Sequence, residues 1–190
     1  DGILQAYLPG DQGGVAVVDI LIGVVNPSGK LPYTYPRYDG AILYYDHKKL
    51  ETLNGNNWKY DFFHPQWNFG YGLSYTDFKF SNLRLSKKNI SISKNEKITL
   101  SVDVENTGDI FGKEVVQLYA RDHYASISPP LRKLVRYNKI SLEPKQKKTV
   151  IFELDALDFG FFGIDFNWTN EVGKHSFFVG DLEASFNLIK

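Results

Sequence analysis

The carboxylates are the residues of this chain best suited to chemistry, because a pair of them can act as acid, base or nucleophile on one bond. Asp103 and Glu105 fall in an alternating strand pattern, which predicts that both side chains lie on its polar, solvated face. Asp155 and Asp158 lie in a turn-rich, glycine-containing stretch, where Asp side chains usually hydrogen-bond the backbone. We therefore predict structural roles for both pairs.

Other residues with chemical potential do not form a recognisable motif. The histidines are spread too widely for a local metal site, and they are His47, His64, His123 and His175. Gly70 and Gly72 flank a tyrosine without the Gly-Lys-Ser/Thr of a phosphate loop, and Ser74 lacks the second glycine of a nucleophile elbow. We expect no bound metal, no cofactor and no acyl-transfer chemistry.

Two tryptophans are candidate substrate-binding residues. Trp58 and Trp67 lie in a segment that is crowded with aromatic residues. Exposed rings there would stack on the flat apolar face of a sugar, whereas buried rings would fix the segment to the domains that it joins. Because aromatic side chains gain so much from burial, we favour packing and keep sugar stacking as the alternative.

The composition is that of a neutral globular protein. The chain is 43% hydrophobic, and its 22 Lys and Arg balance its 22 Asp and Glu. A net charge of zero offers no single-sign field for nucleic-acid phosphates or an anionic membrane, so we expect neither partner. No cysteine is present, which removes disulfide and thiolate chemistry, and no apolar run is long enough to cross a bilayer. The chain also has no methionine, so we expect a processed product or a piece of a longer protein.

The chain divides into three zones, and the first two, residues 1–36 and 37–76, precede the region where strands are expected. In residues 1–36, an apolar run favours a short buried helix, with Asp11 as its N-cap and Gly23 as its stop. Each proline in residues 31–36 denies its predecessor the helical region, which predicts an extended segment. Residues 37–76 show neither a helical nor a strand period, and their aromatic content predicts a linker packed along a surface.

The third zone, residues 77–190, is typical of an all-β domain. Alternation is strict from Ile98 to Glu105, and the apolar parity changes near Ser81, where we predict a bulge or a bend. Further strands are predicted over 115–120, 139–142, 149–154, 176–179 and 185–189. Short strands separated by turn signals over such a length predict a two-sheet sandwich of the immunoglobulin or fibronectin type.

Three blocks of sequence resemble the C-terminal end of glycoside hydrolase family 3, the β-glucosidase and β-xylosidase family. The first begins Pro-Gly-Asp-Gln-Gly-Gly at residues 9–23 and continues as Asn-Pro-Ser-Gly-Lys-Leu-Pro at 26–32. The second is Phe-Gly-Tyr-Gly-Leu-Ser-Tyr-Thr-Asp-Phe at 69–78. The third, at 104–108 and 112–119, is similar to the family's fibronectin type III-like domain.

The resemblance implies a mainly β chain: a fibronectin type III-like sandwich at 77–190, preceded by the C-terminal remnant of an α/β sandwich domain at 1–36. In the family, the aspartate nucleophile lies on an N-terminal barrel and the glutamate acid/base on the middle domain, so both would precede Asp1. The parent would be a retaining, exo-acting β-glycosidase, with β-glucosidase preferred, that is secreted, periplasmic or lysosomal. Its substrate would be a β-linked glycoside, and this segment would be inactive alone and bind the missing catalytic domains, covalently or as a nicked chain.

The alternative is a free-standing, non-catalytic β-sandwich that binds carbohydrate or a protein. Residues 1–36 discriminate between the two interpretations, because an independent sandwich has no need of a buried helix and a proline-rich strand beside it. They favour the hydrolase segment.

Overall fold

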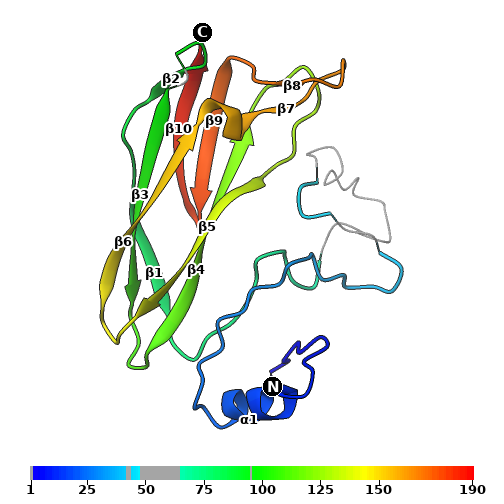
Figure 1. Ribbon diagram of the computed structural model, residues 1–190, viewed down its shortest axis with the longest axis vertical. Helices are drawn as coiled ribbons and strands as arrows, with labels where there is room; N and C mark the ends of the chain where they lie inside the picture. Colours follow the sequence, from blue (N-terminus) through cyan, green and yellow to red (C-terminus); the bar gives the residue numbers. More distant parts are fainter. Residues whose placement is uncertain (1, 42–43, 48–64, 95) are drawn as a thin grey trace, which may run out of the picture.

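The computed structural model describes residues 2–41, 44–47, 65–94 and 96–190. A short helix near the N-terminus is followed by strands (Figure 1). The helix is α1 (Gly13–Leu21), and the strands are β1 (Phe78–Leu85), β2 (Asn89–Ser91), β3 (Lys97–Asn106), β4 (Gly112–Asp122), β5 (Lys133–Leu142), β6 (Lys147–Asp155), β7 (Phe161–Phe162), β8 (Trp168–Thr169), β9 (Gly173–Val179) and β10 (Leu182–Ile189). A 3-10 helix, η2 (Ala156–Phe159), follows β6.

Strands β1 to β6 together with β9 and β10 form the predicted β-sandwich, while β7 and β8 pair in a separate hairpin. One sheet has three strands in the order β1-β3-β6, and the other has five in the order β2-β10-β9-β4-β5. All pairings in the two sheets are antiparallel except that of β2 with β10. The two sheets enclose one core, and the mainly β fold class is confirmed.

Strand β3 shows how the sequence pattern builds this core. Its apolar residues Ile98, Leu100, Val102 and Val104 are all 0% exposed. They meet the opposite sheet through residues such as Leu118 and stacked aromatic rings of β9 and β10. Period-two alternation therefore places one whole face of the strand in the core.

The predicted bulge in β1 is confirmed. The register of β1 against β3 shifts between Ser81 and Arg84, and Asn82 has a φ of 55°. The extra residue restores the apolar parity, so Leu83 and Leu85 join Phe78 in packing against the core.

Helix α1 is present, but its predicted N-cap is wrong. The N-cap residue is Gln12, which makes no side-chain capping bond. The chain turns at Gly10 (φ 65°), and the carbonyl of Gly10 accepts a hydrogen bond from the Gly13 amide at 3.0 Å. A backbone turn thus satisfies this amide, and Asp11 is not needed as a cap. The helix does end before Gly23, which has a φ of 79°.

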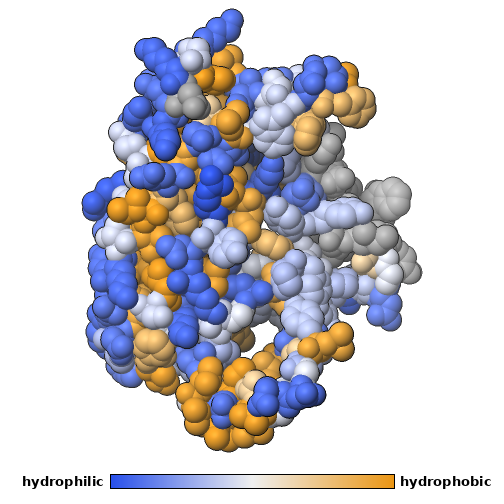
Figure 2. Space-filling view, viewed as in Figure 1, coloured by the Kyte–Doolittle hydropathy of each residue, from blue (hydrophilic) through white to orange (hydrophobic). Residues whose placement is uncertain are grey.

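The apolar side chains of α1 are exposed in this chain, not buried. Val15 is 60% exposed, Val18 50% and Leu21 68%. Figure 2 shows the resulting orange surface at the bottom of the view, where Figure 1 places α1. A helix with such a surface needs another element to cover it. No helix in the described ranges is long and apolar enough to span a membrane.

Candidate functional site at the junction

Two segments far apart in the sequence pair where the N-terminal zone meets the sandwich. The Leu31 amide donates to the Tyr71 carbonyl and the Gly70 amide to the Leu31 carbonyl, both at 2.8 Å. Further along, the Tyr35 amide donates to the Trp67 carbonyl at 2.8 Å. Residues 31–35 are therefore extended, as predicted, and lie antiparallel to residues 67–71. We call residues 26–35 the first segment and residues 67–76 the second, and both together, with the β4 side chains beneath them, the junction.

Two glycines allow the junction to close. A Cβ atom at Gly72 would collide with the Gly29 carbonyl of the other segment. Gly70 has a φ of 79°, and a Cβ there would collide with the Gln117 side chain. Both positions need glycine, one for close approach and the other also for its backbone conformation.

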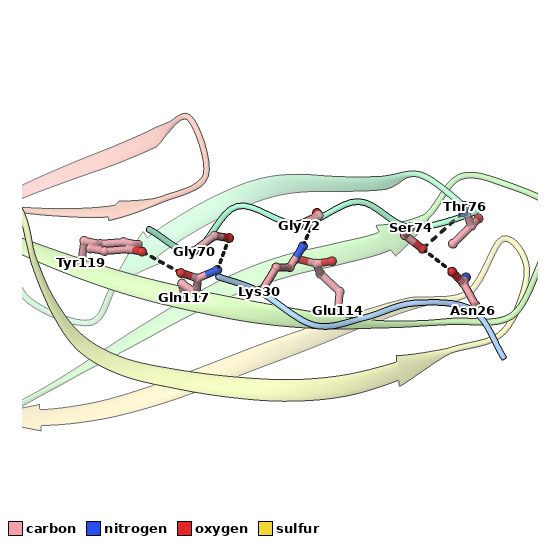
Figure 3. A network of polar contacts seen from close by, with 9 residues as sticks. All are labelled: Asn26, Lys30, Gly70, Gly72, Ser74, Thr76, Glu114, Gln117 and Tyr119. Carbon is pink, nitrogen blue, oxygen red and sulfur yellow. Dashed lines mark hydrogen bonds and ion pairs between the residues drawn. The ribbon is translucent and has the colours of Figure 1, made fainter. Parts of the chain in front are cut away.

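A largely buried ion pair links the first segment to the sandwich. Lys30 Nζ lies 3.0 Å from Glu114 Oε1 of β4, and their side chains are only 16% and 9% exposed. The same ammonium donates to the Gly72 carbonyl at 3.0 Å (Figure 3). One cation thus joins the first segment, the second segment and the sandwich.

Hydrogen bonds from Gln117 and Tyr119 hold the second segment. Gln117 Nε2 donates to the Gly70 carbonyl at 3.0 Å, and Tyr119 Oη donates to Gln117 Oε1 at 2.6 Å (Figure 3). Burial raises the pKa of the Tyr119 hydroxyl to about 12, so it remains a donor at neutral pH. A hollow of about 480 Å³ lies beside these residues. Its Lys30, Gln117 and Tyr119 side chains are already bonded within the protein, which makes it a poor ligand site.

Asparagine side chains complete the network. Asn26 Oδ1 accepts from Ser74 Oγ at 2.9 Å and from the Tyr75 amide at 2.8 Å. Buried Asn106 Oδ1 accepts from Thr76 Oγ1 at 2.6 Å, while its Nδ2 donates to the Ile110 carbonyl at 2.7 Å. Figure 3 shows that Asn26 and Ser74 continue the row of contacts made by Lys30 and Gln117. All three sequence blocks therefore meet at one place.

Trp67 lies within this junction, whereas Trp58 lies outside the described residues. The centre of the Trp67 ring is 5.0 Å from that of the Tyr35 ring, in an edge-to-face arrangement, and 6.3 Å from that of the Tyr71 ring, in a stacked one. Phe69 stacks on Tyr45 at 4.3 Å and contacts Tyr119 edge-on at 6.5 Å. Rings of the second segment thus contact both the first segment and β4.

Three carboxylates that were considered for catalysis have structural partners. Asp155 and Asp158 form a capping box at η2, and Asp158 also pairs with Arg136 at 2.6 Å. Asp103 accepts hydrogen bonds from Asn82 at 2.8 Å and Thr149 at 2.7 Å, and it pairs with Lys147 at 3.2 Å. These partners, Asn82 first, lower the pKa of Asp103 to about 2.

Two of the histidines come together at one end of the sandwich. His175 is 2% exposed, and its Nε2 lies 3.6 Å from Asp122 Oδ2. His123 Nε2 lies 2.9 Å from the hydroxyl of Ser176, and no local motif in the sequence predicts this Ser–His pair. Ser176 is 0% exposed, so no substrate reaches it. Burial, then the charges of Arg121 and Lys174, lower the pKa of His123.

The other two histidines do not join this pair. His64 lies outside the described residues, and His47 lies apart near the junction. In the described part of the chain, no three His, Cys, Asp or Glu side chains form a metal-binding group.

The sandwich and junction define a class: a fibronectin type III-like module with an N-terminal extension bound to it. Two family models match the sequence. The glycosyl hydrolase family 3 C-terminal domain matches residues 1–75, and the fibronectin type III-like domain matches residues 114–183. The chain belongs to glycoside hydrolase family 3 and corresponds to the C-terminal part of its members.

Relatives and solved structures agree with this assignment. The chain is 38% identical to a periplasmic β-glucosidase of Salmonella typhimurium, over 95% of this chain and 24% of the relative. It is 38% identical to a lysosomal β-glucosidase of Dictyostelium discoideum, over 98% and 23% respectively. The solved structure of a β-glucosidase from Erythrobacter marinus superposes with a TM-score of 0.89 at 36% identity, over 97% of this chain and 25% of that one. The chain spans about a quarter of the length of the relatives it matches.

Proposed function

We propose that this chain is the C-terminal segment of a retaining, exo-acting β-glycosidase, most simply a β-glucosidase. The observation that carries the proposal is the convergence of the three family blocks in one junction. The junction fixes the sandwich to the end of the preceding domain, so the segment completes and stabilises the enzyme. The nucleophile and the acid/base belong to the larger enzyme, where retaining hydrolysis requires two carboxyl groups about 5 to 5.5 Å apart.

The proposal includes a division of the chain. Residues 1–36 end the α/β sandwich domain, residues 37–76 form the packed linker, and residues 77–190 form the sandwich. The junction supports this division, because residues 31–35 of the first zone pair with residues 67–71, shortly before the sandwich begins. The substrate is a β-linked glycoside bound by the larger enzyme, and the similarity to periplasmic and lysosomal β-glucosidases favours a location outside the cytoplasm.

The free-standing binding module remains the rival candidate. The exposed aliphatic surface of α1 argues against it, because a monomeric module gains nothing from such a surface. Hydrolysis of an aryl β-glucoside tests the two. We expect turnover by the intact enzyme and none by residues 1–190 alone. Turnover by the isolated chain, or an intact gene product without glycosidase activity, would contradict the proposal.

Substrate contact by Trp58 or Trp67, at the rim of the parent's pocket, is the alternative to packing. If either ring stacks on a sugar, its replacement by Ala in the intact enzyme raises KM more than it lowers the melting temperature. The contacts of Trp67 with Tyr35 and Tyr71 support packing as its main role. Loss of stability with unchanged KM would leave packing as its sole role.

A further inference from the structure

The β7–β8 hairpin carries apolar side chains that the sandwich does not cover. Phe162 is 61% exposed, Ile164 79% and Phe166 86%. Figure 2 shows orange side chains at the upper right, where Figure 1 places this hairpin. Large apolar side chains gathered on one protruding loop are typical of a contact surface.

The loop of the hairpin is held in one shape. The Gly163 amide donates to the Asn167 carbonyl at 2.9 Å, and the Phe166 amide donates to the Gly163 carbonyl at 3.0 Å. The Asp165 carboxylate accepts from the Asn167 amide at 3.2 Å and from Asn167 Nδ2 at 2.7 Å. A loop fixed by its own hydrogen bonds loses little conformational entropy when it binds.

Phe166 has an unfavourable backbone conformation. Its φ is 60°, in the left-handed region that bulky residues avoid. Asparagine or glycine would fit this position better, and neither would expose a ring to water. A strained residue that presents an exposed ring suggests a role outside the fold of this chain.

The hairpin adjoins a contact between the second zone, residues 37–76, and the sandwich. The ammonium of Lys133 lies 5.2 Å from the centre of the Trp168 ring on β8. Two residues earlier, the Leu131 amide donates to the His47 carbonyl at 2.9 Å. Figure 1 places the hairpin and residues 24–41 and 44–47 on the same side of the sandwich. The hairpin therefore extends an interface that already exists within the chain.

We propose that the hairpin docks in an apolar depression on the part of the enzyme that carries the catalytic carboxylates. This inference rests on the proposed function. The relatives are about four times as long as this chain, so most of their surface belongs to that part. Phe166 and Ile164 act as the anchoring side chains of the contact, as aromatic and aliphatic residues do in protein interfaces.

Oxidative footprinting of the intact enzyme and of residues 1–190 tests the docking. Because docking removes Phe166 from water, its modification rate falls about fivefold in the intact enzyme. Tyr137 on β5, which is 68% exposed, is the matched control and keeps its rate. Equal rates at Phe166 in the two proteins overturn the inference. Protection that depends on protein concentration, or on an added β-linked oligosaccharide, also overturns it, in favour of a second copy or a sugar.

A substitution separates docking from folding. Phe166→Asn removes the ring and suits the left-handed backbone, so the melting temperature of residues 1–190 stays the same or rises. In the intact enzyme the same change lowers the melting temperature. Unchanged melting of both proteins contradicts the docking, while glycosidase activity of the intact enzyme reports separately on the proposed function.

Discussion

Strand β3 and helix α1 are both rich in aliphatic residues, yet they bury them to opposite extents. Leu100 and Val102 of β3 are 0% exposed, whereas Leu21 of α1 is 68% exposed. In β3 the apolar residues share one face, and the opposite sheet covers that face. In α1 they surround the helix, so covering it takes neighbours on several sides. The difference teaches that the two sheets of the sandwich cover each other's apolar faces, whereas the apolar surface of α1 is left uncovered within this chain.

Substitutions in the two regions provide the strongest test of this contrast. Phe177 is 0% exposed and stacks on Phe186 at 4.6 Å, so Phe177→Ala should lower the free energy of unfolding by about 3 to 5 kcal/mol. Leu21→Ala should change it by less than about 0.5 kcal/mol in this chain, because the side chain is already in water. Urea unfolding measures both. Comparable losses would show that α1 is part of the same core.

The Lys30–Glu114 pair tests how firmly the two regions are joined. Glu114→Ala leaves the Lys30 ammonium without its counter-charge in a mostly buried site, and should cost about 3 kcal/mol. Asp109→Ala removes an exposed partner of Lys145 and serves as the control, with an expected change within about 0.5 kcal/mol. Hydrogen exchange at Leu31 should accelerate only in the first variant. Equal exchange in both would mean that the ion pair does not hold the segment.

The close approach at Gly72 tests the junction by steric means. Gly72→Ala forces Cβ against the Gly29 carbonyl and should cost about 2 kcal/mol. Gly14→Ala is a suitable control, because a Cβ there meets open space on α1 and alanine favours the helix. Thermal unfolding should separate the variants. An unchanged melting temperature for Gly72→Ala would show that the two segments can move apart without loss.

The smallest expected effect concerns Asp103 on the sandwich surface. Its pKa is lowered from 3.8 to about 2 in the folded chain, so its bonds stabilise the fold above about pH 4. This contribution is lost as the pH falls toward 2. Asp103→Asn should therefore reduce the fall in melting temperature between pH 4 and pH 2. An equal fall in both proteins would contradict the role of this carboxylate.

Local patterns in the sequence predict much of the sandwich. Alternation places β3, and the change of parity at Ser81 places the bulge, because both depend only on neighbouring residues. The pattern predicts only the end of β5, since its first half does not alternate: Leu134 and Val135 are adjacent and both half-buried, and exposed Arg136 and Tyr137 follow on this edge strand. Strand β2 escapes detection because it has three residues and pairs with β10, which lies almost the whole domain further along the chain.

The site is less predictable than the fold. The blocks that contain Lys30, Gly72 and Glu114 are recognisable by resemblance, but their mutual contact depends on how the chain folds between them. From the sequence, Gly72 is typical of a turn residue. The structure shows that it must be glycine because the Gly29 carbonyl occupies the place of a Cβ atom. The prediction of Asp11 as the N-cap of α1 is wrong for a similar reason. The carbonyl of Gly10 accepts the hydrogen bond from the Gly13 amide, so no side-chain cap is needed there.

The hydrogen bonds of Asn106 have a consequence for protein engineering. Its Oδ1 accepts from Thr76 and from the Gly108 amide, and its Nδ2 donates to the carbonyls of Ile110 and Leu142. A sandwich excised at the start of β1 would lose Thr76, and Asn106 Oδ1 would then keep only the hydrogen bond from the Gly108 amide. A transfer of this module to another protein should therefore include the stretch from Asn26 onward, so that the sandwich keeps the segments that bond to it.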